Sequence, residues 1–447
     1  MTSIRKIVAS ALLTITGGLC GVPATWAAIP IQHWTQAGGA QVYLVESPHI
    51  PMLDVQLDFD AGSRRDPASQ AGLASVTVLM AGKGVAARGG EPALDENQLG
   101  EAWADLGASF GGSAGSDRMS FSLRTLTDPD LLQKSVHLAA RELGEPAWPE
   151  DVWRRERERI SASIRESRTR PGTLAGLAFS QAVYGAHPYG YETTPESLAR
   201  IGVADKRAHH ADFIRPCRAK LSLVGAVTRA QADAIVTQLL ARLPPSADCA
   251  PLPAVPEVAT LTAPVDERIA FDSAQAQVLI GQPGYKRSDP DFFALLVGNH
   301  ILGGGGFTSR LTTQVREQRG LSYSVYSYFA PGLHAGAFTL GLQTRPDQAA
   351  IAVEVARQVL RDFVAQGPTE AELQAAKDNL IGGFPLRLDS NRKLLDNVAN
   401  IAWNDLPLDY LEHWSERVRA VSAAEIKTAF QRVLQPERMV TVVLGGR

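Results

Sequence analysis

Hydrophobic and polar residues alternate along several short segments of this chain. Between positions 53 and 59 an apolar side chain stands at every second residue, with Asp54, Gln56 and Asp58 in between. A period of two predicts a β-strand that buries its apolar face and leaves its polar face in solvent. Residues 120–126 alternate in the same way and lead into a turn.

The second half of the chain repeats this order of elements. Residues 338–344 predict another strand. Each strand is followed by a stretch with helical periodicity, at about 131–143 in the first half and 348–364 in the second. A further helix then starts with proline and acidic residues in both halves, at 149–151 and 368–370, which suits a helix N-terminus. The repeated order predicts a duplicated α+β chain.

A proline-rich stretch separates the two halves. Six prolines lie between residues 244 and 264. Proline stiffens the backbone and removes amide donors, so this stretch predicts a linker. We divide the chain into a first unit at 28–242, a linker at 243–264 and a second unit at 265–447.

The N-terminus has the pattern of a secretory signal peptide. Arg5 and Lys6 precede an apolar run at 7–19, and Thr25 and Ala27 supply small residues before a cleavage point. This order predicts a signal peptide at 1–27 and an exported mature chain, most simply in a bacterial periplasm. After cleavage, no long charge-free stretch predicts a membrane span.

Composition limits the classes of function. Hydrophobic residues make up 45% of the chain, charged residues 20%, and the formal net charge is −3. These values indicate a folded globular protein and argue against nucleic acid as a partner. The mature chain keeps Cys217 and Cys249, which could pair in an oxidising compartment. A chain of this length does not need a disulfide scaffold, and two separate thiols are the favoured interpretation.

Residues 72–84 form the most informative segment of the first half. They predict an apolar helix after a strand and a turn, and Gly72-Leu73-Ala74 opens it. In this setting the segment resembles the active-site helix of the pitrilysin/insulysin-type zinc metallopeptidases, the inverzincins. That family carries His-x-x-Glu-His here, two zinc-binding imidazoles and a general base. The resemblance places Ser75 and Leu79 at the histidines and Val78 at the glutamate, and aliphatic side chains cannot bind zinc.

The family's third zinc ligand is a glutamate on a later helix. The matching helix spans about 151–168 and carries Glu156, Glu158 and Glu166, and the sequence does not set the register among them. A solvated, charged helix face is the simpler interpretation. His209 and His210 are interpreted as surface residues, and the His187-Pro188-Tyr189-Gly190 turn as structural.

The second half resembles the C-terminal signature of the same family. Residues 302–311 contain a glycine-rich turn followed by Ser-Arg-Leu, and residues 315–325 contain Arg-Glu and Gly-Leu-Ser-Tyr. The resemblance implies that Arg316 and Tyr323, seven residues apart, approach a zinc site held by the other half or by a partner subunit. A tyrosine hydroxyl can donate to an oxyanion and a guanidinium can hold a substrate carbonyl. Without the resemblance, packing on a helix surface and a strand would explain both.

The glycine run Gly303, Gly304, Gly305 and Gly306 is interpreted as a loop that a peptide backbone can approach closely. This interpretation is favoured over a phosphate-binding loop, since no Lys-Ser or Lys-Thr follows.

Taken over the whole mature chain, the resemblance implies two homologous halves, each a mainly antiparallel sheet packed with helices. It implies a non-catalytic subunit that carries no cofactor, pairs with a zinc-bearing homologous peptidase subunit and acts on peptide substrates. One alternative is a peptide-binding or scaffolding protein with no catalytic partner, and another is a peptidase with a different active site. The retention of Arg316 and Tyr323 favours the non-catalytic subunit over the scaffold, because a scaffold has no need of an oxyanion donor.

Overall fold

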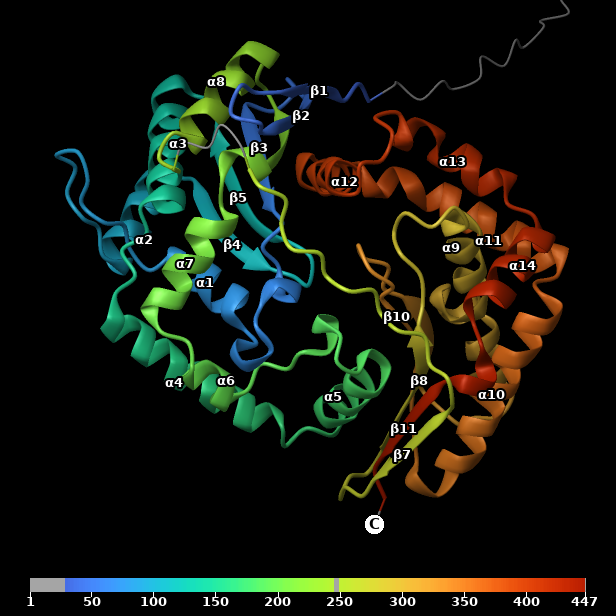
Figure 1. The fold of residues 1–447 in the computed structure, drawn as a ribbon. Helices are drawn as coiled ribbons and strands as arrows, with labels where there is room; N and C mark the ends of the chain where they lie inside the picture. Colours follow the sequence, from blue (N-terminus) through green and yellow to red (C-terminus); the bar gives the residue numbers. More distant parts are fainter. Residues whose placement is uncertain (1–28, 245–248, 447) are drawn as a thin grey trace, which may run out of the picture.

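The computed structural model describes residues 29–244 and 249–446, and the predicted signal peptide lies outside this range. Figure 1 shows two lobes side by side, each built on one sheet with helices around it. The first sheet has the strand order β1-β2-β6-β3-β5-β4. Its strands are β1 Gln32–Thr35, β2 Gln41–Glu46, β3 Met52–Phe59, β4 Ser109–Ala114, β5 Met119–Leu126 and β6 Lys220–Gly225.

The second sheet has the order β7-β11-β8-β10-β9. Its strands are β7 Val265–Ile269, β8 Ala276–Pro283, β9 Val325–Phe329, β10 Ala337–Thr344 and β11 Val440–Leu444. Only β2–β6 in the first sheet and β7–β11 in the second are parallel pairs among the described strands. If β1 is set aside, the two sheets have the same order with the parallel pair in the same place. The predicted duplicated, mainly antiparallel α+β fold is confirmed.

The helices follow the predicted pattern. Those of the first half are α1 Leu73–Ala81, α2 Glu96–Asp105, α3 Pro129–Gly144, α4 Glu150–Ser167, α5 Pro171–Tyr184, α6 Pro195–Ala199, α7 Val203–Phe213 and α8 Arg229–Leu240. Those of the second half are α9 Phe292–Asn299, α10 Ala349–Gln366, α11 Glu370–Gly383, α12 Asn391–Trp403, α13 Tyr410–Ala420 and α14 Ala423–Val433. No helix in the described ranges has the length and apolar character needed to cross a bilayer.

Each half places one helix on the sheet of the other half. Helix α5 packs on β8 and β11, while α12 packs on β6 and β3 (Figure 1). Two contacts fasten α12. Lys220 donates to the Ala402 carbonyl at 2.8 Å, and the Arg118 guanidinium lies 5.6 Å from the centre of the Trp403 ring. Each sheet is therefore covered in part by a helix from the other half.

This exchange overturns the expectation that β3 has a solvent-facing side. Asp54 is 2% exposed and Asp58 is fully buried. Arg118, in the turn before β5, donates to the Asp58 carboxylate at 3.0 Å. Ser120, on β5, donates to the same carboxylate at 2.5 Å. The alternating pattern identifies the polar face of β3 but not what that face contacts. In the structure this face lies beneath α12, and its two carboxylates pair with arginines.

The two histidines of α7 are also buried, which corrects their interpretation as surface residues. His209 is 4% exposed and His210 8%. The His210 ring donates to the Leu143 carbonyl at 2.8 Å, and burial lowers the pKa of His209 to about 4. The His209 ring in turn donates to the Ala61 carbonyl at 3.3 Å, so both neutral imidazoles have buried backbone partners.

The linker from residue 249 onward is attached to both halves at several points. Arg218 donates to the Ala250 carbonyl at 3.0 Å, and the His187 ring donates to the Pro256 carbonyl at 2.9 Å. Glu257 then pairs with Lys286 of the second half at 2.6 Å.

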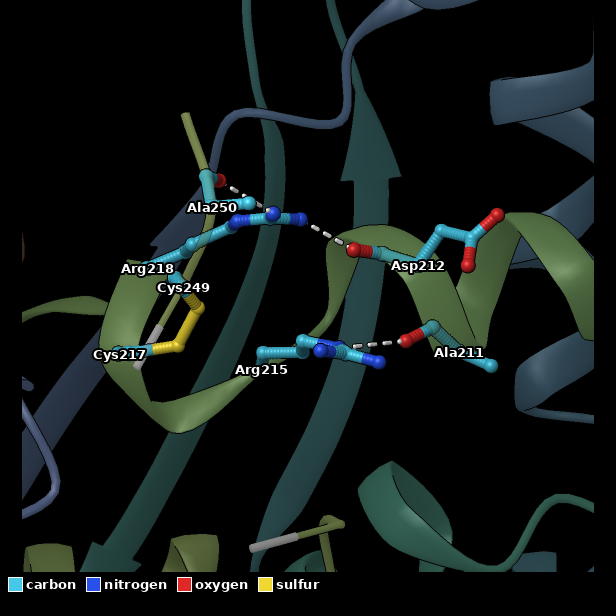
Figure 2. The surroundings of a disulfide bond; sticks show 7 residues. All are labelled: Ala211, Asp212, Arg215, Cys217, Arg218, Cys249 and Ala250. Carbon is cyan, nitrogen blue, oxygen red and sulfur yellow. Dashed lines mark hydrogen bonds between the residues drawn. A yellow bond between two sulfur atoms is a disulfide. The ribbon is translucent and has the colours of Figure 1, made fainter. Parts of the chain in front are cut away.

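A disulfide joins Cys217 to Cys249, which corrects the favoured interpretation of two separate thiols. Figure 2 shows it beside Arg218, whose guanidinium bridges the Asp212 and Ala250 carbonyls. The two cysteines are 32 residues apart in the chain, and only the fold brings their Cα atoms to 6.0 Å.

Candidate functional site

Helix α1 begins at a sharply constrained turn. Gly72 has φ +102°, and a Cβ there would lie 2.6 Å from the Thr193 methyl group, so both backbone and space require glycine. The buried Asp66 carboxylate accepts from the Gly72 and Ala74 amides, both at 2.9 Å. This is a side-chain cap that sets the start of the helix. Burial raises the pKa of Asp66 to about 7.

The three metal-motif positions on α1 offer almost no ligand chemistry. Ser75 is exposed and Leu79 is half-buried. Val78 is 7% exposed and lies under β4, where a Cβ added to Gly112 would come within 2.3 Å of its methyl group. One serine hydroxyl is thus the only side-chain oxygen among the three, and hydroxyl alone is a poor zinc ligand.

The three glutamates of α4 turn out to be unlike one another. Glu158 and Glu166 are exposed as expected, but Glu156 is only 5% exposed, which corrects the interpretation of a wholly solvated face. Its carboxylate lies 2.8 Å from Arg159, 3.4 Å from Arg155 and 3.7 Å from Lys83. These cations already balance its charge.

A signal for this burial exists in the sequence. Trp153, Glu156 and Ile160 share the three-and-four spacing of one helix face, so Glu156 lies on the apolar stripe. Within residues 29–244 and 249–446, no three His, Cys, Asp or Glu side chains are grouped so that they could hold a metal ion. The residues present therefore do not fit the zinc site of the pitrilysin-type peptidases, and this chain has no ligand set for a zinc-dependent step on α1.

Behind the end of α1, Glu142 of α3 is buried in an apolar setting. Its carboxyl accepts from the Trp103 indole at 2.9 Å, and a Cβ added to Gly82 would lie 3.3 Å from it. Burial raises the pKa of Glu142 to about 7. Below pH ~4.5 the group is protonated in both folded and unfolded chains. As the pH rises toward 7 the unfolded chain ionises first, so stability is lost across this window.

We therefore expect Glu142→Gln to remove this loss, because glutamine keeps an acceptor for Trp103 and does not ionise. The variant should match the wild type at pH 4 and exceed its free energy of unfolding by up to about 3 kcal/mol at pH 8. Urea unfolding at both pH values measures this, with Glu158→Gln on the exposed face of α4 as control. If the difference in free energy of unfolding between the two proteins is the same at pH 4 and pH 8, the raised pKa of Glu142 is contradicted.

Arg316 and Tyr323 come together in the second half. Arg316 lies in the helical turn η7 Thr312–Glu317, and its guanidinium carbon is 4.7 Å from the centre of the Tyr323 ring. Tyr323 is 81% exposed. Within the described residues, neither the Arg316 guanidinium nor the Tyr323 hydroxyl has an ion pair or a hydrogen bond. Both groups are therefore available to a molecule outside this chain.

The backbone around Tyr323 is held firmly although its side chain is exposed. The Ser322 hydroxyl bridges to the Ser324 and Gln343 carbonyls, each at 2.7 Å. Thr344 donates to the Leu321 carbonyl at 2.5 Å. These bonds fasten residues 321–324 to β10, so the tyrosine projects from a fixed point.

Phe307 is a member of this site that sequence reasoning missed. Its ring is 70% exposed, and its centre lies 4.8 Å from the Arg316 guanidinium carbon. The signal was an aromatic residue directly after four glycines, where no core position is expected.

The glycine run itself is tightly packed at its first part. A Cβ on Gly303 would lie 2.5 Å from the Ser327 amide nitrogen of β9, and one on Gly305 would lie 2.6 Å from the His300 carbonyl. Gly306 has φ +62° and open space around it. Gly304 and Gly306 are exposed, whereas Gly303 is buried. A peptide could therefore approach the exposed end of the run.

The degenerate helix and the Arg316–Tyr323 pair belong to different halves. Helix α1 packs against α7 and β4, whereas η7 packs against β9, α10 and the turn η6 Gly306–Thr308. A duplicated fold that lacks ligands at the positions of the resembled zinc motif, and that places an exposed Tyr323 beside a half-buried Arg316, is the arrangement expected of a non-catalytic member of a zinc-peptidase class.

The comparisons with known proteins agree with this class. Residues 200–380 match the family described as Peptidase M16 inactive domain. The chain superimposes with a TM-score of 0.87 on a Pseudomonas fluorescens structure described as a peptidase M16 inactive domain, with 33% identity over 93% of this chain and 98% of that one. This chain belongs to the peptidase M16 family and is a non-catalytic member of it.

Two curated relatives show the range of the family. A Mycobacterium leprae protein described as an uncharacterized zinc protease is 27% identical over 92% of this chain and 91% of its own length. The Helicobacter pylori protein described as the non-peptidase homolog YmxG is 25% identical over 92% of both chains.

Proposed function

We propose that this chain is the non-catalytic subunit of a heteromeric zinc endopeptidase and lends Arg316 and Tyr323 to the active site of a zinc-bearing partner of the same family. The observation that carries this proposal is an exposed Tyr323 on a fastened segment beside a half-buried Arg316, both with side chains free of hydrogen bonds within the described residues. The chain's own metal positions hold Ser75, Val78 and Leu79. Within the described residues, no metal site is present that these two side chains could assist.

The chemistry of the two side chains suits peptide hydrolysis. Attack of water on a peptide carbonyl places negative charge on its oxygen, and the Tyr323 hydroxyl can donate a hydrogen bond to that charge. The Arg316 guanidinium presents N–H donors that can hold a second carbonyl of the substrate in position. The partner would supply the activated water. Gly304 and Gly306 would let the peptide backbone come close.

The alternative is a scaffold that binds peptides with no catalytic partner, and the name of the Helicobacter pylori relative is consistent with either function. Native affinity purification separates the two. We expect a second, zinc-containing homologue to co-purify and peptidase activity to accompany it. Repeated purification of the chain alone, with no activity recovered by adding extracts of its host, would favour the scaffold.

We further propose that the mature chain is exported and starts near Ala28, which the N-terminal sequence of the same native sample would test. The disulfide between Cys217 and Cys249 supports this proposal, since such bonds persist in oxidising compartments. An intact Met1 on soluble native protein would contradict it.

The isolated chain is expected to contain well below one equivalent of zinc and to show no chelator-sensitive peptidase activity. The reason is the ligand chemistry of α1, where two of the three motif positions are aliphatic. Metal analysis and a peptide-cleavage assay with and without chelator measure this. One tightly bound equivalent of zinc that is lost on Ser75→Ala would contradict the assignment.

A further inference from the structure

We propose that Phe307 is a positioning residue, which holds the Arg316 guanidinium in the orientation that receives a substrate carbonyl. The inference rests on the proposed function and adds the residue that orients its arginine. The first support is the isolation of the ring. Phe307 is 70% exposed, and within the described residues its only ring or cation contact is with Arg316. A single exposed ring is common on protein surfaces, so the observation that carries weight is its contact with the Arg316 guanidinium, 4.8 Å from the ring centre.

The second support is the rigidity of the turn that carries the ring. The Thr308 hydroxyl donates to the Gly305 carbonyl at 3.1 Å, and the Ser309 hydroxyl donates to the Gly306 carbonyl at 2.8 Å. Ser309 is fully buried, and Gly306 adopts the left-handed conformation that a side chain would resist. The ring therefore projects from an anchored turn and can act as a fixed surface.

The third support is what an unrestrained arginine would do. A long side chain with no ion pair samples many rotamers, and that freedom is lost when it binds a substrate. The Phe307 and Tyr323 rings make no aromatic contact with each other in the described chain, so each borders the guanidinium separately. Contact with a ring face leaves the N–H edge of the guanidinium open to a carbonyl. In the proposed function the Tyr323 hydroxyl donates to the oxyanion. Phe307 has no such group, so its contact serves only to orient the Arg316 guanidinium.

The test uses Phe307→Leu, which removes the aromatic face, and Phe307→Tyr, which restores it. The isolated full chain, labelled with ¹⁵N-arginine, reports the mobility of the Arg316 Nε–H group, whose signal is identified by its loss in Arg316→Lys. We expect this group to be restrained in the wild type and in Phe307→Tyr and mobile in Phe307→Leu. In the reconstituted peptidase, Phe307→Leu should raise KM about two- to fivefold, the value of an exposed cation–π contact, with kcat little changed. Phe307→Tyr should recover the wild-type KM.

The outcomes separate this inference from the proposed function. An Arg316 group that stays restrained in Phe307→Leu overturns the positioning role and leaves the proposed function standing. The role is also overturned if KM does not change in Phe307→Leu while Arg316→Ala raises it. If Arg316→Ala itself leaves hydrolysis unchanged, the proposed function fails and this inference fails with it.

Discussion

Replacing Tyr323 by Phe is expected to lower the turnover of the reconstituted peptidase about 100-fold or more, because one donor to the oxyanion is lost. Assembly should be unchanged, since the ring that lies beside Arg316 remains. Complex formation and peptide hydrolysis must therefore be measured separately. A hydroxyl that acts only in the transition state should lower kcat and kcat/KM together.

Tyr326→Phe provides the matched control. Tyr326 is also exposed and lies only three residues away on β9, but its ring makes no cation–π contact with Arg316 among the described residues. That variant should turn over at the wild-type rate. If Tyr323→Phe also assembles and turns over as the wild type does, the shared active site is refuted and the peptide-binding scaffold becomes the better hypothesis.

Removing the disulfide with Cys217→Ser and Cys249→Ser together is expected to lower the free energy of unfolding by about 3–4 kcal/mol. The bond closes a segment of 32 residues, and chain entropy in the unfolded state grows when that closure is lost. The same change should loosen the start of the linker, where Arg218 bridges two carbonyls beside the bond (Figure 2).

Urea unfolding of the double variant, beside wild type with and without reductant, measures the effect. Reduced wild type should unfold at the midpoint of the double variant, and reductant should not move the variant further. Two reactive thiols from Cys217 and Cys249 in the unreduced native protein would show that the bond does not form.

The repeat of strand, turn, helix and helix start was readable because each is a local pattern. Alternation, helical spacing and Pro-acidic starts depend on neighbours a few residues away, and both halves carry them in the same order. The absence of zinc ligands on α1 was readable for a stronger reason. Ligand chemistry belongs to the residue type, and no tertiary arrangement makes Val78 or Leu79 a metal ligand.

The tertiary structure decided what the polar residues face. Periodicity identified the polar side of β3, but α12, more than 300 residues further along the chain, covers it and buries Asp54 and Asp58. In the same way, His209 is buried against the Ala61 carbonyl, and His210 against the Leu143 carbonyl and the Trp148 ring.

Two pairings were beyond the sequence for the same physical reason. The closure of Cys217 on Cys249 and the approach of Phe307 to Arg316 both depend on how the backbone returns to itself. A sequence by itself determines which groups can bind, pair or ionise. Their partners and their burial are set by where the backbone brings them in space, whether the separation is nine residues, as for Phe307 and Arg316, or several hundred, as for β3 and α12. Only the folded structure specifies those positions.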